Sequence, residues 1–352
     1  MNRYLLCAFL WGIAATGCRH QKEENPAPAI DTAVQTFQIP EIDRLTQLIK
    51  KDPNNPNLYY QRHFAFIQHN DLKRAFSDLS MALALDSANL SYYDAMAELA
   101  LRSGAAQAAV KAYQQLLQRN PNHLEAIIKL SKVFYLQKDY TNSLLQLSRA
   151  EALDRSNAEI WFIRGLNLKE MKDTVRAIAA FQKAVVLKPE FYDAYIQLGL
   201  LHSNRPSSLA AQYYDNAIRL DSTSVEAYYN KGKFFQDRGL RAFDQRNYQQ
   251  AHQDFELAKA VYRELITKNP QYELAYFNMG FIYAKQDSLD KAHRMFDLAV
   301  KMNPAYAEAY YYRGLMALQK GDVQQAQADF RQCLSLKPDF KKAADELKQM
   351  PQ

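Results

Sequence analysis

The chain has 352 residues, of which 48% are hydrophobic and 23% are charged, and its formal net charge is +6. Because the 44 basic and 38 acidic residues are dispersed, this small surplus argues against nucleic-acid binding. Only ten glycines and little alternating strand pattern predict an all-α protein, and the hydrophobic content is ample for a buried core.

Residues 1–17 have the pattern of a secretory signal peptide. Arg3 precedes an apolar run from Tyr4 to Ala15, which is too short to cross a bilayer comfortably, and small residues precede Cys18. Ala15-Thr16-Gly17-Cys18 resembles a bacterial lipobox, although Leu is commoner than Ala at its first position. The resemblance implies cleavage before Cys18 and lipidation of Cys18, with several acyl chains giving stable membrane anchoring. An ordinary signal peptide followed by a chance cysteine is the alternative.

Residues 18–39 carry Pro26 and Pro28 with little periodicity, which predicts a flexible tether after the lipidated cysteine. The residue after Cys18 is not Asp, and by resemblance to lipoprotein sorting rules this favours the outer membrane. The run 21–24 (QKEE) resembles an export signal that sends lipoproteins of Bacteroidetes-type bacteria to the cell surface. A solvated charged tether is the alternative, so the periplasmic face and the cell surface both stay open.

Residues 40–51 (PEIDRLTQLIKK) form one expected helix, which begins at Pro40 and ends at Asp52. Its apolar residues recur at helical spacing and make one buried stripe. In register it matches the second helix of a repeat whose first helix is missing. We therefore interpret residues 40–55 as an N-terminal capping helix.

The rest of the chain repeats with a period of 34 residues. Successive helix-ending positions are separated by 34, 34, 34, 34, 33, 48, 34 and 34 residues: Pro53, Ser87, Pro121, Arg155, Pro189, Ser222, Pro270, Pro304 and Pro338. Each repeat reads as two amphipathic helices joined by a short turn. The best copy, residues 273–306, has Tyr276, Gly280, Ala292, Phe296 and Pro304 at its key positions. This pattern resembles the tetratricopeptide repeat (TPR) family.

The resemblance implies an α-α superhelix of about eight helix-turn-helix repeats. Repeats 1–5 occupy residues 56–224, an elongated repeat 6 occupies 225–272, repeats 7 and 8 occupy 273–340, and a capping helix occupies 341–352. Small residues such as Gly165 and Ala177 should face each other where the paired helices approach most closely. His63 takes this small position in repeat 1, where we expect it to be tolerated because it lies at an exposed end of the array.

Repeat 6 is longer than the others by 14 residues. The simplest account is one extra heptad in each helix, which preserves their pairing and lengthens the hairpin by about 10 Å. Its expected tip carries a partner-contact or dimerisation candidate made of Arg238, Arg241, Phe243 and Arg246. A solvated tip without function is the alternative.

No enzyme motif occurs in the sequence, and the seven histidines are scattered without metal-ligand spacing, so we expect neither catalysis, nor a metal, nor a cofactor. Cys333 takes a small-residue position of its repeat. It is the only cysteine left after Cys7 leaves with the signal and Cys18 is lipidated, so we expect a buried small side chain and no disulfide.

By family resemblance, the first helix of each repeat lines a concave groove through two positions. They lie one and five residues after the lead aromatic position of the repeat, which is Tyr276 in residues 273–306. Carried over, these positions are Tyr60, Phe64, Asp94, Glu98, Ile128, Lys132, Phe162, Leu166, Ile196, Leu200, Tyr229, Lys233, Phe277, Phe281, Tyr311 and Leu315. The predicted groove is aromatic and apolar, with one acidic patch at Asp94 and Glu98. An exposed apolar groove favours an extended peptide or an amphipathic helix as ligand. About half of these side chains are expected to pack against the next repeat instead.

The sequence thus favours a non-catalytic, lipid-anchored TPR scaffold of the bacterial outer membrane. It would hold protein or peptide partners in the cell envelope, for assembly, secretion or motility. The second hypothesis is a surface module that binds a glycan or a nutrient peptide. The sequence does not name the partner or the oligomeric state.

Overall fold

The computed structural model describes residues 39–203 and 209–350, and these ranges contain eighteen α-helices and no strand. The expected signal peptide, Cys18 and the tether lie outside the described residues. The helices are α1 Pro40–Lys51, α2 Pro56–Gln68, α3 Leu72–Leu85, α4 Leu90–Arg102, α5 Ala106–Arg119, α6 Leu124–Leu136, α7 Tyr140–Leu153, α8 Ala158–Glu170, α9 Thr174–Leu187, α10 Tyr192–Ser203, α11 Leu209–Leu220, α12 Val225–Asp244, α13 Tyr248–Lys268, α14 Glu273–Lys285, α15 Leu289–Met302, α16 Ala307–Gln319, α17 Val323–Leu336 and α18 Lys341–Gln349.

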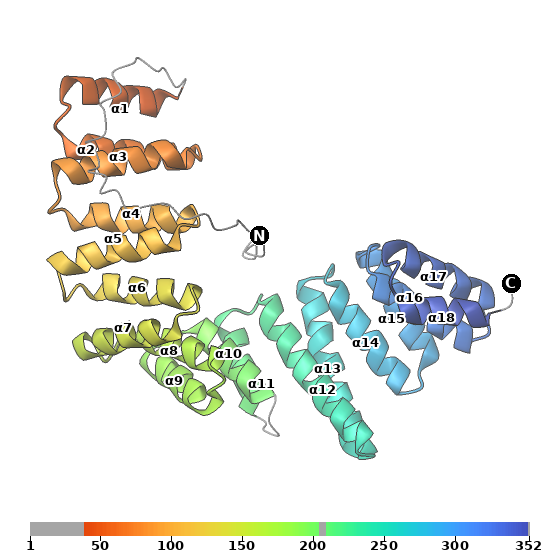
Figure 1. Ribbon diagram of the computed structural model, residues 1–352. Coiled ribbons are helices and arrows are strands. Elements are labelled where there is room, and N and C mark those ends of the chain that lie inside the picture. Colours follow the sequence, from red (N-terminus) through yellow and green to blue (C-terminus); the bar gives the residue numbers. More distant parts are fainter. Residues whose placement is uncertain (1–38, 204–208, 351–352) are drawn as a thin grey trace, which may run out of the picture. The chain divides into compact units, whose positions relative to one another are not determined.

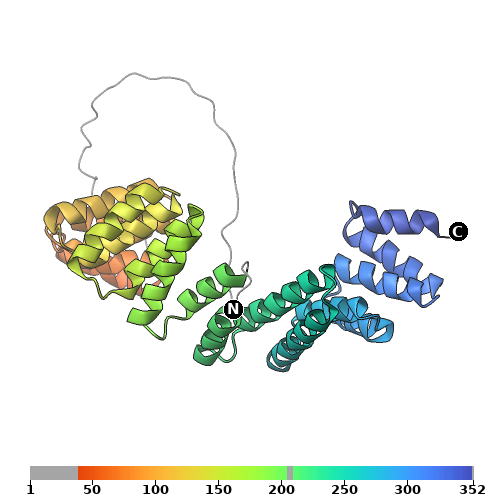
Figure 2. The ribbon, with the colours of Figure 1, turned by 90° about the horizontal axis from the view of Figure 1, so that it is seen from below.

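The helices fall into two compact units, the first ending at Arg119 and the second beginning at Asn120. In the first unit, α1 packs on α2, and the pairs α2/α3 and α4/α5 follow each other (Figure 1). In the second unit, six further pairs run from α6/α7 to α16/α17, and α18 covers α17 (Figure 2). The all-α prediction is confirmed, and each unit is a stack of helical hairpins.

The turn inside each hairpin ends the first helix and caps the second. Asn70, Lys138 and Lys172 have φ near +60°, a left-handed conformation that reverses the chain. In each case the next residue is an aspartate whose side chain accepts a hydrogen bond from the amide three residues later. These aspartates cap α3, α7 and α9. The second helix therefore begins at a fixed place in each of these repeats.

Within a pair, the closest contact joins a small residue of the first helix to a large one sixteen residues later. A Cβ added at Gly165 would lie 2.6 Å from the ring of Phe181, and one at Gly280 would lie 2.8 Å from the ring of Phe296. The sequence pattern predicted small residues on both sides of this contact. At these two glycines the nearest side-chain atoms belong instead to an aromatic ring that is fully buried, and the missing side chain makes room for it.

Between repeats, the lead aromatic of the first helix holds the preceding turn. The hydroxyls of Tyr59, Tyr93 and Tyr276 each donate to the carbonyl oxygen six residues earlier, at 3.0, 3.1 and 3.1 Å. These acceptors include Pro53 and Pro270, which the sequence pattern marks as helix-ending positions. The lead aromatic is therefore a packing residue with a satisfied polar group.

The sixth hairpin reaches beyond its neighbour α14 (Figure 1). Its helices α12 and α13 have 20 and 21 residues, whereas α14 and α15 have 13 and 14. The difference is seven residues in each helix, as one added heptad requires. The glycine–aromatic contact also occurs twice, because Gly232 meets Tyr262 and Gly239, one heptad later, meets Phe255. The insertion therefore duplicates a packing unit without breaking the pairing.

Candidate partner-binding site

In the first unit, side chains of two successive first helices enclose a pocket of about 210 Å³ between α2 and α4. Four of the predicted groove residues lie in it: Tyr60, Phe64, Asp94 and Glu98. Phe64 is 48% exposed, so its ring is available to a ligand. Burial raises the pKa of Tyr60, and the carboxylates of Asp94 and Glu98 raise it further. The pocket therefore combines an aromatic wall with negative charge, to which Arg102 adds one positive charge.

His63 lines the same pocket but is only 1% exposed, so the expectation of an exposed position is wrong. The reason is that α1 packs on α2 and that α4 completes the pocket, so repeat 1 is covered on both sides. The ring Nδ1 donates to the carbonyl oxygen of Tyr60. Burial lowers the pKa of His63 to about 4, so the ring is neutral at physiological pH.

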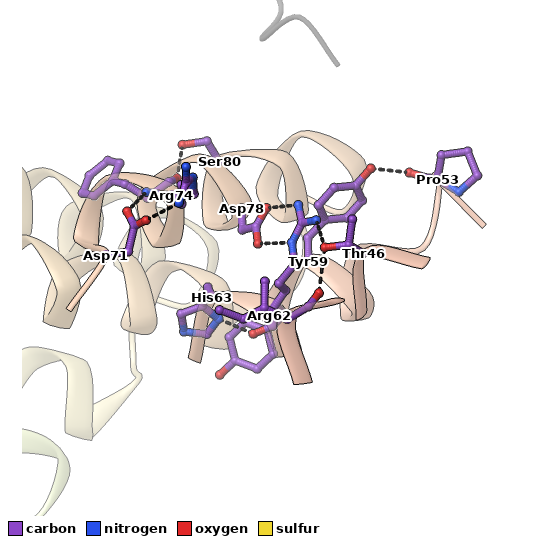
Figure 3. A network of polar contacts seen from close by, with 12 residues as sticks. Thr46, Pro53, Tyr59, Arg62, His63, Asp71, Arg74, Asp78 and Ser80 are labelled. Atoms are coloured by element: carbon purple, nitrogen blue, oxygen red, sulfur yellow. Dashed lines mark hydrogen bonds and ion pairs between the residues drawn. The ribbon is translucent and has the colours of Figure 1, made fainter. Parts of the chain in front are cut away.

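A buried ion pair joins α2, which forms one wall of this pocket, to α3 (Figure 3). The guanidinium of Arg62 donates to both carboxylate oxygens of Asp78, at 2.7 and 2.8 Å, and to the hydroxyl of Thr46 at 2.9 Å. The pair joins α2 to α3, and the third bond joins α2 to α1. Because the Asp78 and Arg62 side chains are only 6% and 15% exposed, this network fixes the helices and does not serve as a ligand site.

In the second unit, a larger pocket of about 340 Å³ lies among α8, α10, α11 and α12. Its charged lining consists of Lys169, Lys233, Asp237 and Arg241. Lys233 pairs with Asp237, and Lys169 donates to the side chain of Gln197 at 3.0 Å. Leu200 also lines the pocket, so two predicted groove residues and one predicted tip residue, Arg241, meet there.

The other predicted groove residues differ in how far their side chains are exposed to solvent. Ile128 and Tyr311 are 4% and 6% exposed, so both contribute mainly to the core. Lys132 forms an ion pair with Glu159 at 2.5 Å. Phe281 is half-buried beside Tyr312, with ring centroids 5.8 Å apart.

Four predicted groove residues each contact an aromatic ring from the turn before the next repeat. The ring centroids are 4.7 Å apart for Phe162 and Phe191, 5.6 Å for Tyr229 and Tyr272, 4.9 Å for Phe277 and Tyr306, and 5.1 Å for Tyr311 and Phe340. The partners Tyr272, Tyr306 and Phe340 occupy the residue immediately before α14, α16 and α18. Sequence reasoning missed them.

The same register in earlier repeats holds helix-capping residues. Asn55, Asn89 and Asn157 precede α2, α4 and α8, and each side chain accepts a hydrogen bond from a helix amide. Tyr272, Tyr306 and Phe340 make no such bond. A lost cap costs about 1 kcal/mol, and an aromatic pair contributes about 0.5–1.5 kcal/mol. Replacing a capping residue by an aromatic residue at this position therefore changes the stability of the fold little.

At the expected tip of the elongated hairpin, the nominated residues have different roles. Arg238 is held by Asp254, whose side chain is fully buried, so it stabilises the hairpin. Arg246 has φ +60° and forms the reversal of the turn. Phe243 packs edge-on against Tyr248, which is 59% exposed, with ring centroids 5.4 Å apart. Of the nominated residues, Phe243 and Arg246 therefore lie at the turn of the hairpin, beside Tyr248.

Within residues 39–203 and 209–350, no group of three or more His, Cys, Asp or Glu side chains could hold a metal ion. Cys333 is fully buried, and burial raises the pKa of its thiol to about 11. A thiol in that state is a packing group and a poor nucleophile. In the part of the chain that the structure describes, no helix combines the length and the apolar character that a membrane span needs.

Parts of the chain match models of known repeat families. Residues 307–340 and 274–306 each match a tetratricopeptide repeat model, and residues 94–189 match a model described as the TT21 fifth ARM repeats domain. Residues 274–340 are therefore similar to two successive tetratricopeptide repeats. Human tetratricopeptide repeat protein 6 is 24% identical over 307 residues, covering 74% of this chain and 55% of its own length. The chain thus spans about half the length of that TPR relative.

Two bacterial proteins are also similar to this chain. An uncharacterized lipoprotein of Treponema pallidum is 23% identical over 181 residues, which cover 49% of this chain and 92% of that protein. The crystal structure of the C-terminal part of a TPR repeat-containing protein from Cytophaga hutchinsonii has a TM-score of 0.60 at 18% identity, covering 74% of this chain and all of the other. The structural likeness shows the TPR-like fold.

Proposed function

We propose that this protein is a non-catalytic TPR scaffold that binds segments of other proteins through the first helices of its repeats. The observation that carries the proposal is the pocket between α2 and α4. There, two predicted positions from each of two successive repeats lie together, and one of them, Phe64, is 48% exposed. A large exposed aromatic beside carboxylates is typical of a partner-binding surface. Matches to tetratricopeptide repeat models support this class of function.

The scaffold would act in the bacterial cell envelope, anchored by lipid on Cys18 to the outer membrane. The support is the lipobox-like sequence before Cys18 and the similarity to the lipoprotein of Treponema pallidum. The anchor and the tether would let the repeats capture a partner close to the membrane. Assembly, secretion and motility are the envelope processes we propose for it.

The test is partner recovery from membranes by affinity purification of the full-length chain. Phe64→Ser should reduce recovery of the groove-dependent partner at least about tenfold, because an exposed aromatic contact at an interface centre is a typical hot spot. Leu145→Ser is the matched control, since Leu145 is 56% exposed on α7, a second helix. Both variants should melt like the wild type. Equal recovery with Phe64→Ser and wild type would contradict the proposal.

Phe277 and Phe281, two further predicted groove residues, are less suitable test positions. Phe277 contacts the rings of Phe296, Tyr306 and Tyr312, at 5.5, 4.9 and 5.5 Å between centroids. Replacing it by Ser would remove packing as well as any ligand contact. Reduced recovery with this variant would therefore not separate lost binding from lost packing.

A further inference from the structure

Five aromatic side chains of repeats 6 to 8 lie on successive first helices or at the residue just before them, and we call them the aromatic strip: Tyr229, Tyr272, Phe277, Tyr306 and Tyr312. Ring contacts join Tyr229 to Tyr272, and join Phe277 to both Tyr306 and Tyr312. All five side chains are partly exposed. Because exchanging helix caps for aromatic rings brings no clear gain in stability, the strip needs another explanation.

The strip carries four hydroxyl groups that have no hydrogen-bond partner among the described residues: those of Tyr229, Tyr272, Tyr306 and Tyr312. None of the four is buried away from solvent. Other tyrosines of the same unit use their hydroxyls internally; Tyr276 donates to Pro270, and Tyr262 donates to Gln236. The strip therefore presents free donors on an apolar surface.

The phenols of Tyr272, Tyr306 and Tyr312 have raised pKa values and stay protonated at neutral pH. Burial raises the pKa of Tyr272 to about 12, with further contributions from Tyr229 and Glu273. Burial also raises the pKa of Tyr306, as do Glu308, Tyr229 and Glu273.

The strip also carries a negative charge. Glu273 accepts a hydrogen bond from the neutral side-chain amide of Asn303 at 3.2 Å, which leaves its charge uncompensated by that bond. Glu308, in contrast, is paired with Lys337 at 3.0 Å. A ligand would therefore be favoured by a basic residue opposite Glu273.

We propose that the aromatic strip binds a proline-rich segment with a basic residue, in the polyproline II conformation; this rests on the proposed scaffold function. A polyproline II chain has apolar pyrrolidine rings, and its backbone carbonyls lack internal hydrogen bonds, so they can accept from tyrosine hydroxyls. A helical ligand could not, because its carbonyls are already bonded. A sugar ring needs a free aromatic face, whereas Phe277 is contacted by three neighbouring rings.

The test measures binding of the full-length chain to a short fluorescein-labelled peptide that contains Pro-Pro-Arg-Pro-Pro. Tyr272→Phe combined with Tyr306→Phe removes two hydroxyls and keeps both rings, and should weaken binding at least about tenfold. Tyr276→Phe is the matched control, because its hydroxyl is bonded inside the fold; it should bind like wild type. Tyr272→Asn with Tyr306→Asn places the capping residue of earlier repeats there, and should abolish binding with little change in melting temperature.

Comparison ligands separate the alternatives. A peptide with Ala in place of every Pro, and one with Glu in place of Arg, should each bind at least about tenfold more weakly than the probe. No binding of the probe, equal binding of the Ala peptide, or unchanged affinity of the Tyr272→Phe/Tyr306→Phe variant would overturn the inference, as would preference for a soluble glucan oligosaccharide. If Phe64→Ser still loses its partner in any of these cases, the scaffold proposal stands while this inference fails.

Discussion

Arg313 and Asp329 form a two-pronged ion pair between α16 and α17, with bonds of 2.9 and 2.7 Å. The two residues are sixteen apart, and the same relation joins Arg62 to Asp78 and Arg238 to Asp254. For Arg313 and Arg238, the pair lies one residue before a contact between a glycine and an aromatic ring. Arg313 also reaches Asp297 of the preceding repeat at 2.7 Å. One side chain therefore ties together a hairpin and its neighbour.

Asp329→Ala should lower the free energy of unfolding by about 3 kcal/mol, because it leaves a guanidinium that is only 15% exposed with one carboxylate instead of two. Thermal melting of the full-length chain measures the effect. The combined Arg313→Met/Asp329→Leu variant should recover most of the loss, since it removes the charges together. Unchanged melting of Asp329→Ala would show that the pair contributes nothing to stability.

Gly165→Ser should lower the free energy of unfolding by about 1–3 kcal/mol, because its Cβ would lie 2.6 Å from the ring of Phe181. Repeat 3 has Ser131 and Leu147 at these two positions, both fully buried. The combined Gly165→Ser/Phe181→Leu variant should therefore melt closer to the wild type than Gly165→Ser alone. If the second change destabilises further, the two positions do not act as a pair.

The sequence predicts the hairpins well because their period depends on local residue types. Glycine, alanine and aromatic residues recur at packing positions, so the seven-residue extension of α12 and α13 follows from spacing alone. The role of Tyr272 and Tyr306 is not predictable in that way. In the sequence both residues stand where a loop ends. Only the structure shows that their rings contact aromatic rings of the first helices.

The burial of His63 was missed for a similar reason. The pattern assigns residues 40–51 to a cap but does not show that α1 and α4 enclose the first repeat from two sides. Likewise, Tyr60 and Tyr311 take the same position in their repeats, yet Tyr60 is partly exposed whereas Tyr311 is 6% exposed. Exposure at a groove position therefore depends on the neighbours that the fold supplies.

His63 should make the protein less stable in acid. Its pKa falls from 6.5 to about 4 on folding, so the unfolded chain takes up a proton first as the pH is lowered. Stability should therefore be constant above about pH 7 and decrease between pH 6.5 and 4, by about 2 kcal/mol after allowance for solvent screening.

The wild-type minus His63→Leu difference in melting temperature, measured between pH 7.5 and 4, isolates this effect. The difference should shift in favour of the variant as the pH falls. His69→Leu, at the exposed end of α2, is the control and should keep the wild-type pH profile. A pH-independent difference for His63→Leu would contradict a buried neutral ring.

Cys18→Ser should abolish lipidation. Metabolic labelling with palmitate in the bacterial host should mark the wild-type chain and leave the variant unlabelled, because the acyl chains are expected on the thiol and the new amine of Cys18. Cys333→Ser is the control and should keep the label, since Cys333 is buried in the fold. Equal labelling of the Cys18→Ser variant would place the anchor elsewhere.

The most direct test of the scaffold proposal is photo-crosslinking in intact cells, with a benzophenone amino acid at single positions. Phe64 and Phe281 represent the first helices, and Leu145 and Val186, which are 56% and 71% exposed, represent the second helices. We predict that defined partner proteins crosslink from Phe64 or Phe281 and not from Leu145 or Val186. Crosslinks that arise only from the second helices, or equally from all four positions, would contradict binding through the first helices.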